Sequence, residues 1–303
     1  MLCPYCLKKT SGTSCRECHE NLPPLYLQRH GGFARNVAIL SAVGFSGHGK
    51  TVYLASLLHM LDKRLIQIWP KYYRQGLDVD TVLTVQDNLA RLQKGDLPES
   101  TRRNFPKPSI HLLKEIPQYG SRCLLVYDPP GEAFDSDDGI QRYAHFVQRS
   151  PVVLFLVSLV DLREPKDEDL FRLLNTYVLG MGRMLARTRE QHLIVAYTKA
   201  DLLTGAWQKY PEVLAHLGDA DYQAMAAPKK YLETLKRIST SLATYTEQEL
   251  EALLFLRLAQ KEFKSLTFCA VSALGNPPED GHLSTNIEPR RVADPLIWVI
   301  EKS

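Results

Sequence analysis

The sequence has no long hydrophobic run, no strong charge bias and no repeated or low-complexity tract. Its longest apolar stretch, from Pro151 to Val160, is about half the roughly 20 residues that a membrane helix needs. The net charge of +3, from 37 basic and 34 acidic residues, is too small to indicate a nucleic-acid-binding surface over the whole chain. The first residues, Met-Leu-Cys-Pro-Tyr-Cys, lack the basic and then apolar pattern of a secretory signal. We therefore expect a cytoplasmic protein that binds no membrane.

The chain divides into a short polar start and a long apolar-rich remainder. Its 303 residues, 45% apolar and 23% charged, are enough for one large core with a small module. Residues 1–20 are polar and rich in cysteine, whereas residues 21–35 hold two prolines and two glycines. Apolar runs begin near residue 36. We expect a module over 1–20, a linker over 21–35 and one α/β domain over 36–303.

Four of the six cysteines lie in the first eighteen residues and form two Cys-x-x-Cys pairs separated by eight residues. Each pair supplies two thiolates, so together they complete a tetrahedral Zn²⁺ site. The segment resembles a short bacterial zinc ribbon, and with so few apolar residues it depends on the metal for stability. Redox-active dithiols are the competing interpretation. The predicted zinc ligands are Cys3, Cys6, Cys15 and Cys18.

Buried-strand and helix patterns alternate after residue 36. Continuous apolar runs are typical of strands that a parallel sheet buries on both faces. Their alternation with helical patterns predicts a doubly wound α/β domain. Residues 202–265 exceed an ordinary crossover and predict a helical insert, which either packs on the domain or offers an effector or dimer surface. The predicted strands are 37–43, 109–116, 123–127, 152–159, 192–197 and 266–271, and the predicted helices are 51–61, 81–94, 139–149, 166–188, 228–264 and 292–301.

The segment from Gly44 to Thr51, GFSGHGKT, matches the phosphate-binding pattern G-x-x-x-x-G-K-[ST]. It lies between an apolar run and a helical pattern, as that pattern requires. Glycines let backbone N–H groups curl around phosphates, and the following helix directs its positive end at the anion. Lys50 is expected to contact the β- and γ-phosphates and Thr51 to bind Mg²⁺. The predicted nucleotide-binding residues here are Gly44, Ser46, Gly47, His48, Gly49, Lys50 and Thr51.

A second apolar run ends in Asp128-Pro-Pro-Gly131-Glu132. An aspartate at the carboxyl end of a strand can hold Mg²⁺ through water, so Asp128 is a predicted magnesium residue. The N–H of Gly131 is a predicted partner of the γ-phosphate. An ordinary Asp-Pro turn is the competing interpretation.

Two further strand ends carry residues suited to a purine base. In Thr198-Lys199-Ala200-Asp201, the aspartate can accept both N–H groups on the Watson–Crick edge of guanine, which adenine does not offer. The Lys199 stem can lie over the base. A backbone N–H in the turn Ser272-Ala273-Leu274 can bond the guanine carbonyl.

The order of these four segments resembles that of the Ras-like GTPases of the translation-factor-related P-loop class. The resemblance implies a six-stranded sheet whose antiparallel edge strand is 109–116, and a Mg²⁺-dependent switch between GTP and GDP. It also implies a switch threonine, for which Thr101 fits best and Thr81 and Thr84 fit less well. The segment before Thr101, the extra helix and the zinc ribbon resemble the double-GTPase families of bacterial conflict systems.

One departure from this family is Glu132, since many members carry glutamine there to orient the attacking water. We therefore expect a slow GTPase whose catalytic residues are Lys50, Thr101, Gly131 and Glu132. Its expected partners are an effector protein and a second GTPase as a dimer partner. The alternatives are an ATP-dependent P-loop enzyme and a non-hydrolysing scaffold that presents the zinc ribbon.

Overall fold

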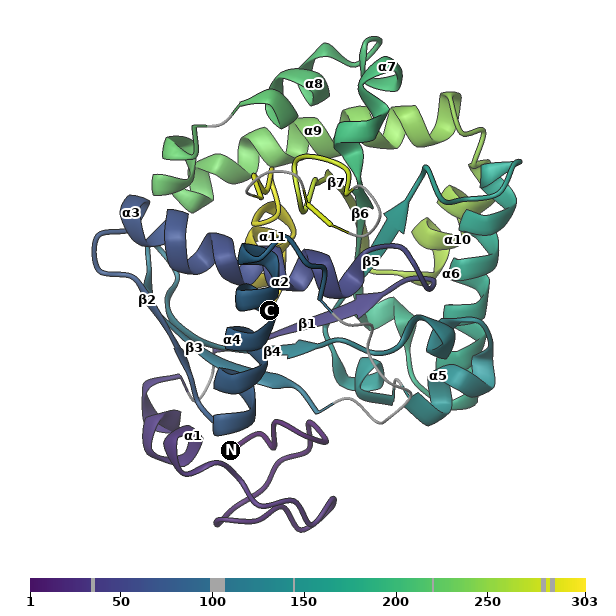
Figure 1. Ribbon diagram of the computed structural model, residues 1–303. Coiled ribbons are helices and arrows are strands. Elements are labelled where there is room, and N and C mark those ends of the chain that lie inside the picture. Colours follow the sequence, from purple (N-terminus) through teal and green to yellow (C-terminus); the bar gives the residue numbers. More distant parts are fainter. Residues whose placement is uncertain (34–35, 99–106, 144, 220, 279–281, 284–286) are drawn as a thin grey trace.

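The computed structural model describes residues 1–33, 36–98, 107–143, 145–219, 221–278, 282–283 and 287–303. Within these ranges, seven strands form one sheet in the order β2-β3-β4-β1-β5-β6-β7 (Figure 1). The predicted mostly parallel α/β sheet is thereby confirmed. The strands are β1 Val37–Val43, β2 Tyr73–Gly76, β3 Ser109–Ile116, β4 Gly120–Tyr127, β5 Val152–Ser158, β6 His192–Thr198 and β7 Ser265–Ala270.

The five strands from β4 to β7 in this order run parallel, so their carboxyl ends meet at one edge of the sheet. Side chains along β1 alternate between two apolar layers. Ile39 and Val43 pack into one layer, and Leu40 and Ala42 into the other. Burial on both faces explains why these strands are continuous apolar runs in the sequence.

Two details of the predicted sheet are wrong. The described residues form seven strands instead of six, and β3 lies inside the sheet, antiparallel to both β2 and β4. The short strand β2, Tyr73–Gly76, is the edge. Its sequence, Tyr-Arg-Gln-Gly, has no apolar run because one side of an edge strand faces solvent, which is why the sequence pattern does not reveal it.

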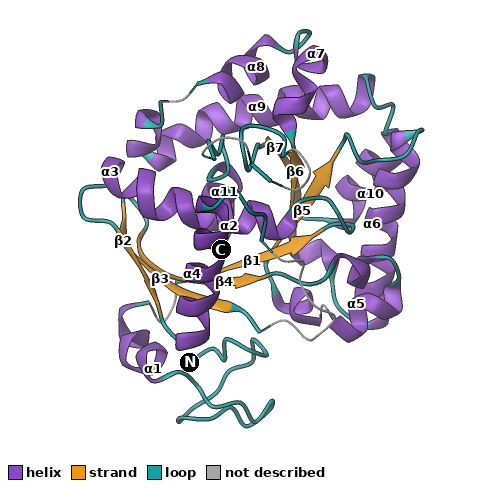
Figure 2. Ribbon diagram, viewed as in Figure 1, coloured by secondary structure: helices purple, strands orange, loops and turns teal. Residues whose placement is uncertain are grey.

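Helices cover both faces of the sheet (Figure 2). On one face α2, α4 and α11 pack against the strands, and on the other α5, α6 and α10 do so, while α9 contributes apolar side chains to both layers beside β7. The side chain of Asp78 accepts a hydrogen bond from the Thr81 N–H at 2.7 Å and so caps the start of α4. These helices are α2 Lys50–Met60, α4 Val79–Gln93, α5 Asp137–Tyr143, α6 Lys166–Arg183, α9 Pro228–Gln248, α10 Leu253–Glu262 and α11 Asp294–Lys302.

The N-terminal segment lies against the β3–β4 end of the sheet (Figure 1). Where the sequence predicted a linker, the chain forms the helix α1, Pro24–Arg29, and a 3₁₀ turn over His30–Gly32. Tyr26 and Phe33 are fully buried and belong to the same apolar layer as Ile110 of β3. This segment, with its helix, therefore covers part of one face of the sheet.

The predicted insert between β6 and β7 is helical. It contains α7 Thr204–Trp207, α8 Pro211–Gly218, α9 and α10. Trp207 is fully buried, and its indole N–H donates to the Ala200 carbonyl at 2.8 Å, so this end of the insert packs onto the domain. A short helix, α3 Ile66–Ile68, precedes β2. In the described part of the chain, no helix has the length and apolar character needed to cross a membrane.

Candidate functional site

The loop between β1 and α2 turns sharply and carries a buried lysine. Gly47 and Gly49 have φ angles of 82° and 78°, a backbone conformation that side chains disfavour. Helix α2 begins directly after them at Lys50. The Lys50 ammonium donates to the carbonyl oxygens of Gly44 and Phe45, each at 2.9 Å. Burial lowers the pKa of Lys50, because neutral carbonyls compensate a desolvated cation only in part.

His48 connects this loop to two neighbouring strands. Its Nδ1 accepts from the Ser158 N–H at 3.3 Å, and its carbonyl accepts from the Thr198 hydroxyl at 3.1 Å. The side chain is 3% exposed, and burial, assisted by the charge of Lys50, lowers its pKa to about 4. His48 is therefore a neutral acceptor near pH 7 that ties the ends of β5 and β6 to the loop.

Two oxygen ligands suited to Mg²⁺ lie side by side. The Thr51 hydroxyl, in the first turn of α2, donates to Asp128 Oδ2 at 2.8 Å. Adjacent ligands of an octahedral Mg²⁺ ion are about 2.9 Å apart, so the pair matches one edge of that geometry. The residues fit the ion through a hydroxyl and a carboxylate, and Asp128 lies one residue beyond the end of β4.

Gly131 lies directly against the loop. A Cβ atom on this residue would come within 2.4 Å of the Ser46 backbone, so the contact requires glycine. A cavity of about 270 Å³ lies beside this contact, and it is lined by Gly131, Glu132, Lys50, Thr51 and Pro98. We call this cavity the phosphate end.

A second cavity of about 240 Å³, the base end, adjoins it, and both are lined by Gly47, Gly49 and Val52. The two predicted base-reading segments come together here, although more than 70 residues separate them in the chain. The predicted residues that line the base end are Thr198, Lys199, Asp201, Ser272, Ala273 and Leu274.

The predicted switch threonine, Thr101, lies outside the described residues. Of the less favoured choices, Thr81 has a structural role, since its hydroxyl donates to Asp78 at 2.6 Å and accepts from the Ile110 N–H at 2.8 Å. Thr84 lines a separate 360 Å³ cavity that also reaches Thr51 and Asp128.

Two residues at or beside the base end were not predicted from the sequence. Asp161, just after β5, pairs with Lys199 at 2.5 Å. Burial raises the pKa of Asp161, but the bonds from Lys199 and Ser158 together with the charge of Lys199 lower it overall. Leu97 reaches the base end from the segment between α4 and β3. No sequence pattern marks either residue, because each is recruited by tertiary contact.

The four N-terminal cysteines converge. Their sulfur atoms all lie within 4.8 Å of one another, with Cys3–Cys18 at 3.7 Å and Cys6–Cys15 at 3.6 Å. A tetrahedral zinc site with 2.3 Å bonds has sulfurs about 3.8 Å apart, so the cluster fits Zn²⁺. Burial opposes ionisation of Cys15, but backbone N–H groups of Cys18 and Glu17 lower its pKa to about 6, which favours the thiolate that a metal binds.

The two cysteine pairs have matching backbone turns. The N–H of Leu7 donates to the Cys3 carbonyl at 3.0 Å, and that of His19 donates to the Cys15 carbonyl at 2.9 Å. Leu7 and His19 both have left-handed backbones, with φ near 57° and 58°. The same local structure thus presents each pair of thiols to one point.

The cysteine module is tied to the phosphate end. Tyr127, the last residue of β4 and the neighbour of Asp128, donates its buried hydroxyl to the Pro4 carbonyl at 2.5 Å. Arg149 donates to the Cys6 carbonyl at 2.9 Å. Both contacts reach the first cysteine pair, so the module packs directly against the domain.

No protein-family model matches the chain, and no curated protein matches it. Among solved structures, the chain is similar to the bacterial selenocysteine-specific elongation factor EF-Sec at 14% identity and a TM-score of 0.38. It is also similar to the signal recognition particle receptor SRb-GTP/SRX complex from Chaetomium thermophilum (13%, 0.40) and to the S. cerevisiae Ski7 GTPase-like domain bound to GTP (13%, 0.34). The matches cover 88% of this chain in each case and 28%, 98% and 50% of the respective neighbours. The chain therefore spans under a third of the elongation factor's length.

Proposed function

We propose that this chain is a Mg²⁺-dependent GTPase that acts as a switch. The observation that supports this most is one pair of adjoining cavities that share Gly47, Gly49 and Val52. Buried Lys50 lines the phosphate end, and the carboxylate residue Asp201 lines the base end. The buried Lys50 ammonium in a glycine loop suits the anionic tail of a nucleotide, and the Asp201 carboxylate suits the donor-bearing edge of guanine.

Lys50 supports the assignment of the phosphate end. Its ammonium is buried, and in the described part of the chain no carboxylate lies within ion-pair distance of it. An anion in the loop would provide the missing charge and would raise the lowered pKa of Lys50. Thr51 and Asp128 would hold Mg²⁺, which neutralises phosphate charge when bound.

Hydrolysis in this proposal depends on positioning. Lys50 and the N–H of Gly131 stabilise the transferring phosphoryl group, Thr101 completes the magnesium site, and Glu132 lies near the attacking water. A carboxylate repels the γ-phosphate, so turnover is slow. We expect Glu132→Gln to increase the single-turnover rate constant of GTP hydrolysis several-fold, about 1 kcal/mol in the barrier. An unchanged rate constant would remove Glu132 from this role.

Base selection separates this proposal from an ATP-dependent enzyme. We expect the purified protein with Mg²⁺ to bind labelled GTP and GDP far more tightly than ATP. Asp201→Asn replaces one acceptor oxygen with a donor and should reduce the GTP preference by about 100-fold, the value of a bidentate base contact. Asp161→Asn is the matched control, because Asp161 pairs with Lys199 at the edge of the same end. Equal binding of ATP and GTP by the wild type would refute the proposal.

Multiple turnover separates a switch from a nucleotide-bound scaffold. A scaffold would retain one nucleotide per chain, whereas a switch releases GDP and repeats the cycle. In this proposal the switch acts on a protein partner, in line with the resemblance to double-GTPase families of bacterial conflict systems, and a second GTPase is the expected dimer partner. The cysteine module binds Zn²⁺ through Cys3, Cys6, Cys15 and Cys18 and is a candidate contact for that partner.

A further inference from the structure

The base-reading turn Ser272–Leu274 is held by a segment from the far end of the domain. Residues 288–291, which we call the brace, run beside it. The N–H of Ser272 donates to the Arg290 carbonyl at 3.0 Å, and the N–H of Arg290 donates back at 2.7 Å. The N–H of Glu288 donates to the Leu274 carbonyl at 2.8 Å. The position of the turn therefore depends on the position of the brace.

Arg291, the last residue of the brace, binds the helical insert. Its side chain is 1% exposed, and its backbone is left-handed with φ 55°, a conformation that costs energy for arginine. Its guanidinium donates to the carbonyls of His216 and Asp219, each at 2.6 Å, and pairs with the Asp219 carboxylate at 2.6 Å. One buried side chain thus joins the brace to the end of α8 in the helical insert.

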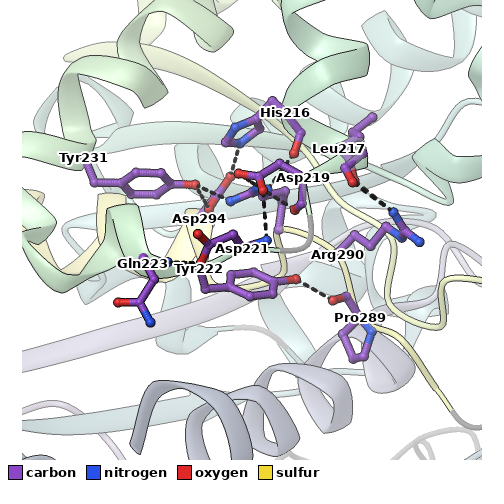
Figure 3. Close-up of polar contacts among 12 residues, drawn as sticks. His216, Leu217, Asp219, Asp221, Tyr222, Gln223, Tyr231, Pro289, Arg290 and Asp294 are labelled. Carbon is purple, nitrogen blue, oxygen red and sulfur yellow. Dashed lines mark hydrogen bonds and ion pairs between the residues drawn. The ribbon is translucent and has the colours of Figure 1, made fainter. Parts of the chain in front are cut away.

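A second set of contacts supports the same connection (Figure 3). The Tyr222 hydroxyl donates to the Pro289 carbonyl at 2.7 Å, and its ring lies 5.2 Å from the Arg291 guanidinium. Asp294 lies three residues beyond the end of the brace. Its carboxylate accepts from the Tyr231 hydroxyl at 2.8 Å and lies 2.7 Å from His216 Nε2. The insert therefore contacts the chain on both sides of Arg291, at Pro289 and at Asp294.

Buried arginine requires many matched acceptors, and leaving any of them unpaired is costly. All the acceptors come from the insert, whereas the backbone on the opposite side of the brace bonds the base-reading turn. Arg291 bonds the insert, and its neighbour Arg290 bonds Ser272 of the turn. A displacement of the insert near Arg291 would therefore displace the turn.

We propose that Arg291 is a positioning residue for guanine recognition, through which the helical insert sets the location of the Ser272–Leu274 turn. This inference rests on the proposed function. It assigns the turn to the guanine carbonyl, O6, and leaves the ring N–H and amino groups to Asp201. The two contacts can be separated with inosine nucleotides, which keep O6 but lack the 2-amino group.

The test uses the full chain with Mg²⁺ and measures the Kd of GDP, IDP and inorganic tripolyphosphate by displacement of a fluorescent GDP analogue. Arg291→Lys keeps the charge but loses the forked donors, and we expect GDP and IDP to weaken by the same factor, about 10-fold. Tyr222→Phe removes one hydrogen bond and should weaken both about 3-fold. Tripolyphosphate affinity should stay within a factor of two, because the phosphate end is untouched.

Tyr119→Phe is the matched control, since it also deletes one tyrosine hydrogen bond, to Glu301 at 2.7 Å, but far from the cavities. It should leave all three Kd values unchanged. If Arg291→Lys fails to fold, Tyr222→Phe decides the question. Unchanged GDP affinity in a folded Tyr222→Phe protein, or equal weakening of tripolyphosphate, overturns the inference. Lack of GDP binding by the wild type would instead refute the proposed function itself.

Discussion

The phosphate end and the base end of the cavity are built in different ways. The phosphate end is mainly one continuous loop, from Gly44 to Thr51, whose shape follows from its own glycines and from the start of α2. The base end combines two strand-end turns and depends on a brace near the C-terminal helix and on an insert between them. A local site can be recognised from a short motif, whereas a site assembled over long sequence distances needs the fold to bring its parts together.

The difference suggests that perturbations at the two ends have separable effects. A change at the phosphate end should weaken every nucleotide alike, since all share the phosphates. A change at the base end should weaken guanine nucleotides and leave bare phosphates unaffected. Three predictions test this separation, beginning with the largest expected effect.

Removal of zinc should have the largest effect on stability, and any effect on binding should be at the phosphate end. Structural zinc contributes about 10 kcal/mol or more to small modules, and residues 1–20 have little apolar core of their own. We expect a zinc chelator to expose Lys8, Lys9 and Arg16 to trypsin within the unfolded module, while the α/β domain stays folded. Unfolding of the module removes the Pro4 carbonyl that accepts from the Tyr127 hydroxyl, next to Asp128. We therefore expect tripolyphosphate to bind more weakly, and the ratio of GDP to IDP affinity not to change.

The control for this experiment is re-addition of Zn²⁺, which should restore protection from trypsin. Continued protection in the chelated protein would show that the module folds without metal. A change in the GDP to IDP ratio would show that the two ends are coupled, which would break the comparison.

Lys50→Met should have the next largest effect. It removes the buried ammonium but keeps most of the side-chain volume, so GTP, GDP and tripolyphosphate should each bind about 100-fold more weakly. Lys199→Met is the matched control at the base end, where Lys199 pairs with Asp161. The control should leave tripolyphosphate binding intact. Equal losses in the two variants, measured by isothermal titration calorimetry, would contradict the assignment of the ends.

The smallest effect concerns pH and His48. Its folded-state pKa of about 4 is below the ordinary value of 6.5, so the unfolded chain binds the proton more readily. His48 therefore costs little stability above about pH 7, and the free energy of unfolding falls as the pH drops from there towards 4. Between pH 7 and pH 5.5 we expect this residue to reduce the free energy of unfolding by about 1.2 kcal/mol. The described residues that line the base end include no histidine.

His48→Asn keeps an acceptor for the Ser158 N–H and should remove this share of the pH dependence in urea unfolding. His192→Asn is the control, since burial also lowers the pKa of His192 to about 4, but this residue begins β6 at the opposite end of the strand. His192→Asn should remove a similar part of the pH dependence of the unfolding free energy, without altering nucleotide affinity. An identical pH profile for wild type and His48→Asn would contradict the prediction.

Sequence patterns sufficed where structure is local. Continuous apolar runs located the buried strands, and the paired cysteines converge as their spacing predicted. The edge strand β2 escaped prediction because four residues with one solvent-facing side carry no apolar run. The helix α1 escaped because its two leading prolines are typical of linkers, although proline also suits the first turn of a helix.

The sequence by itself determined the glycine loop, the strand-end residues and the buried strands, since each leaves a local pattern of residue types. Only the tertiary structure decided that Arg291 is buried, that the insert reaches the brace, and that the base-reading turn depends on both. Arginine is ordinarily exposed, and no local pattern reveals a buried one. Its acceptors lie 60 or more residues away along the chain, so only folding could bring them together.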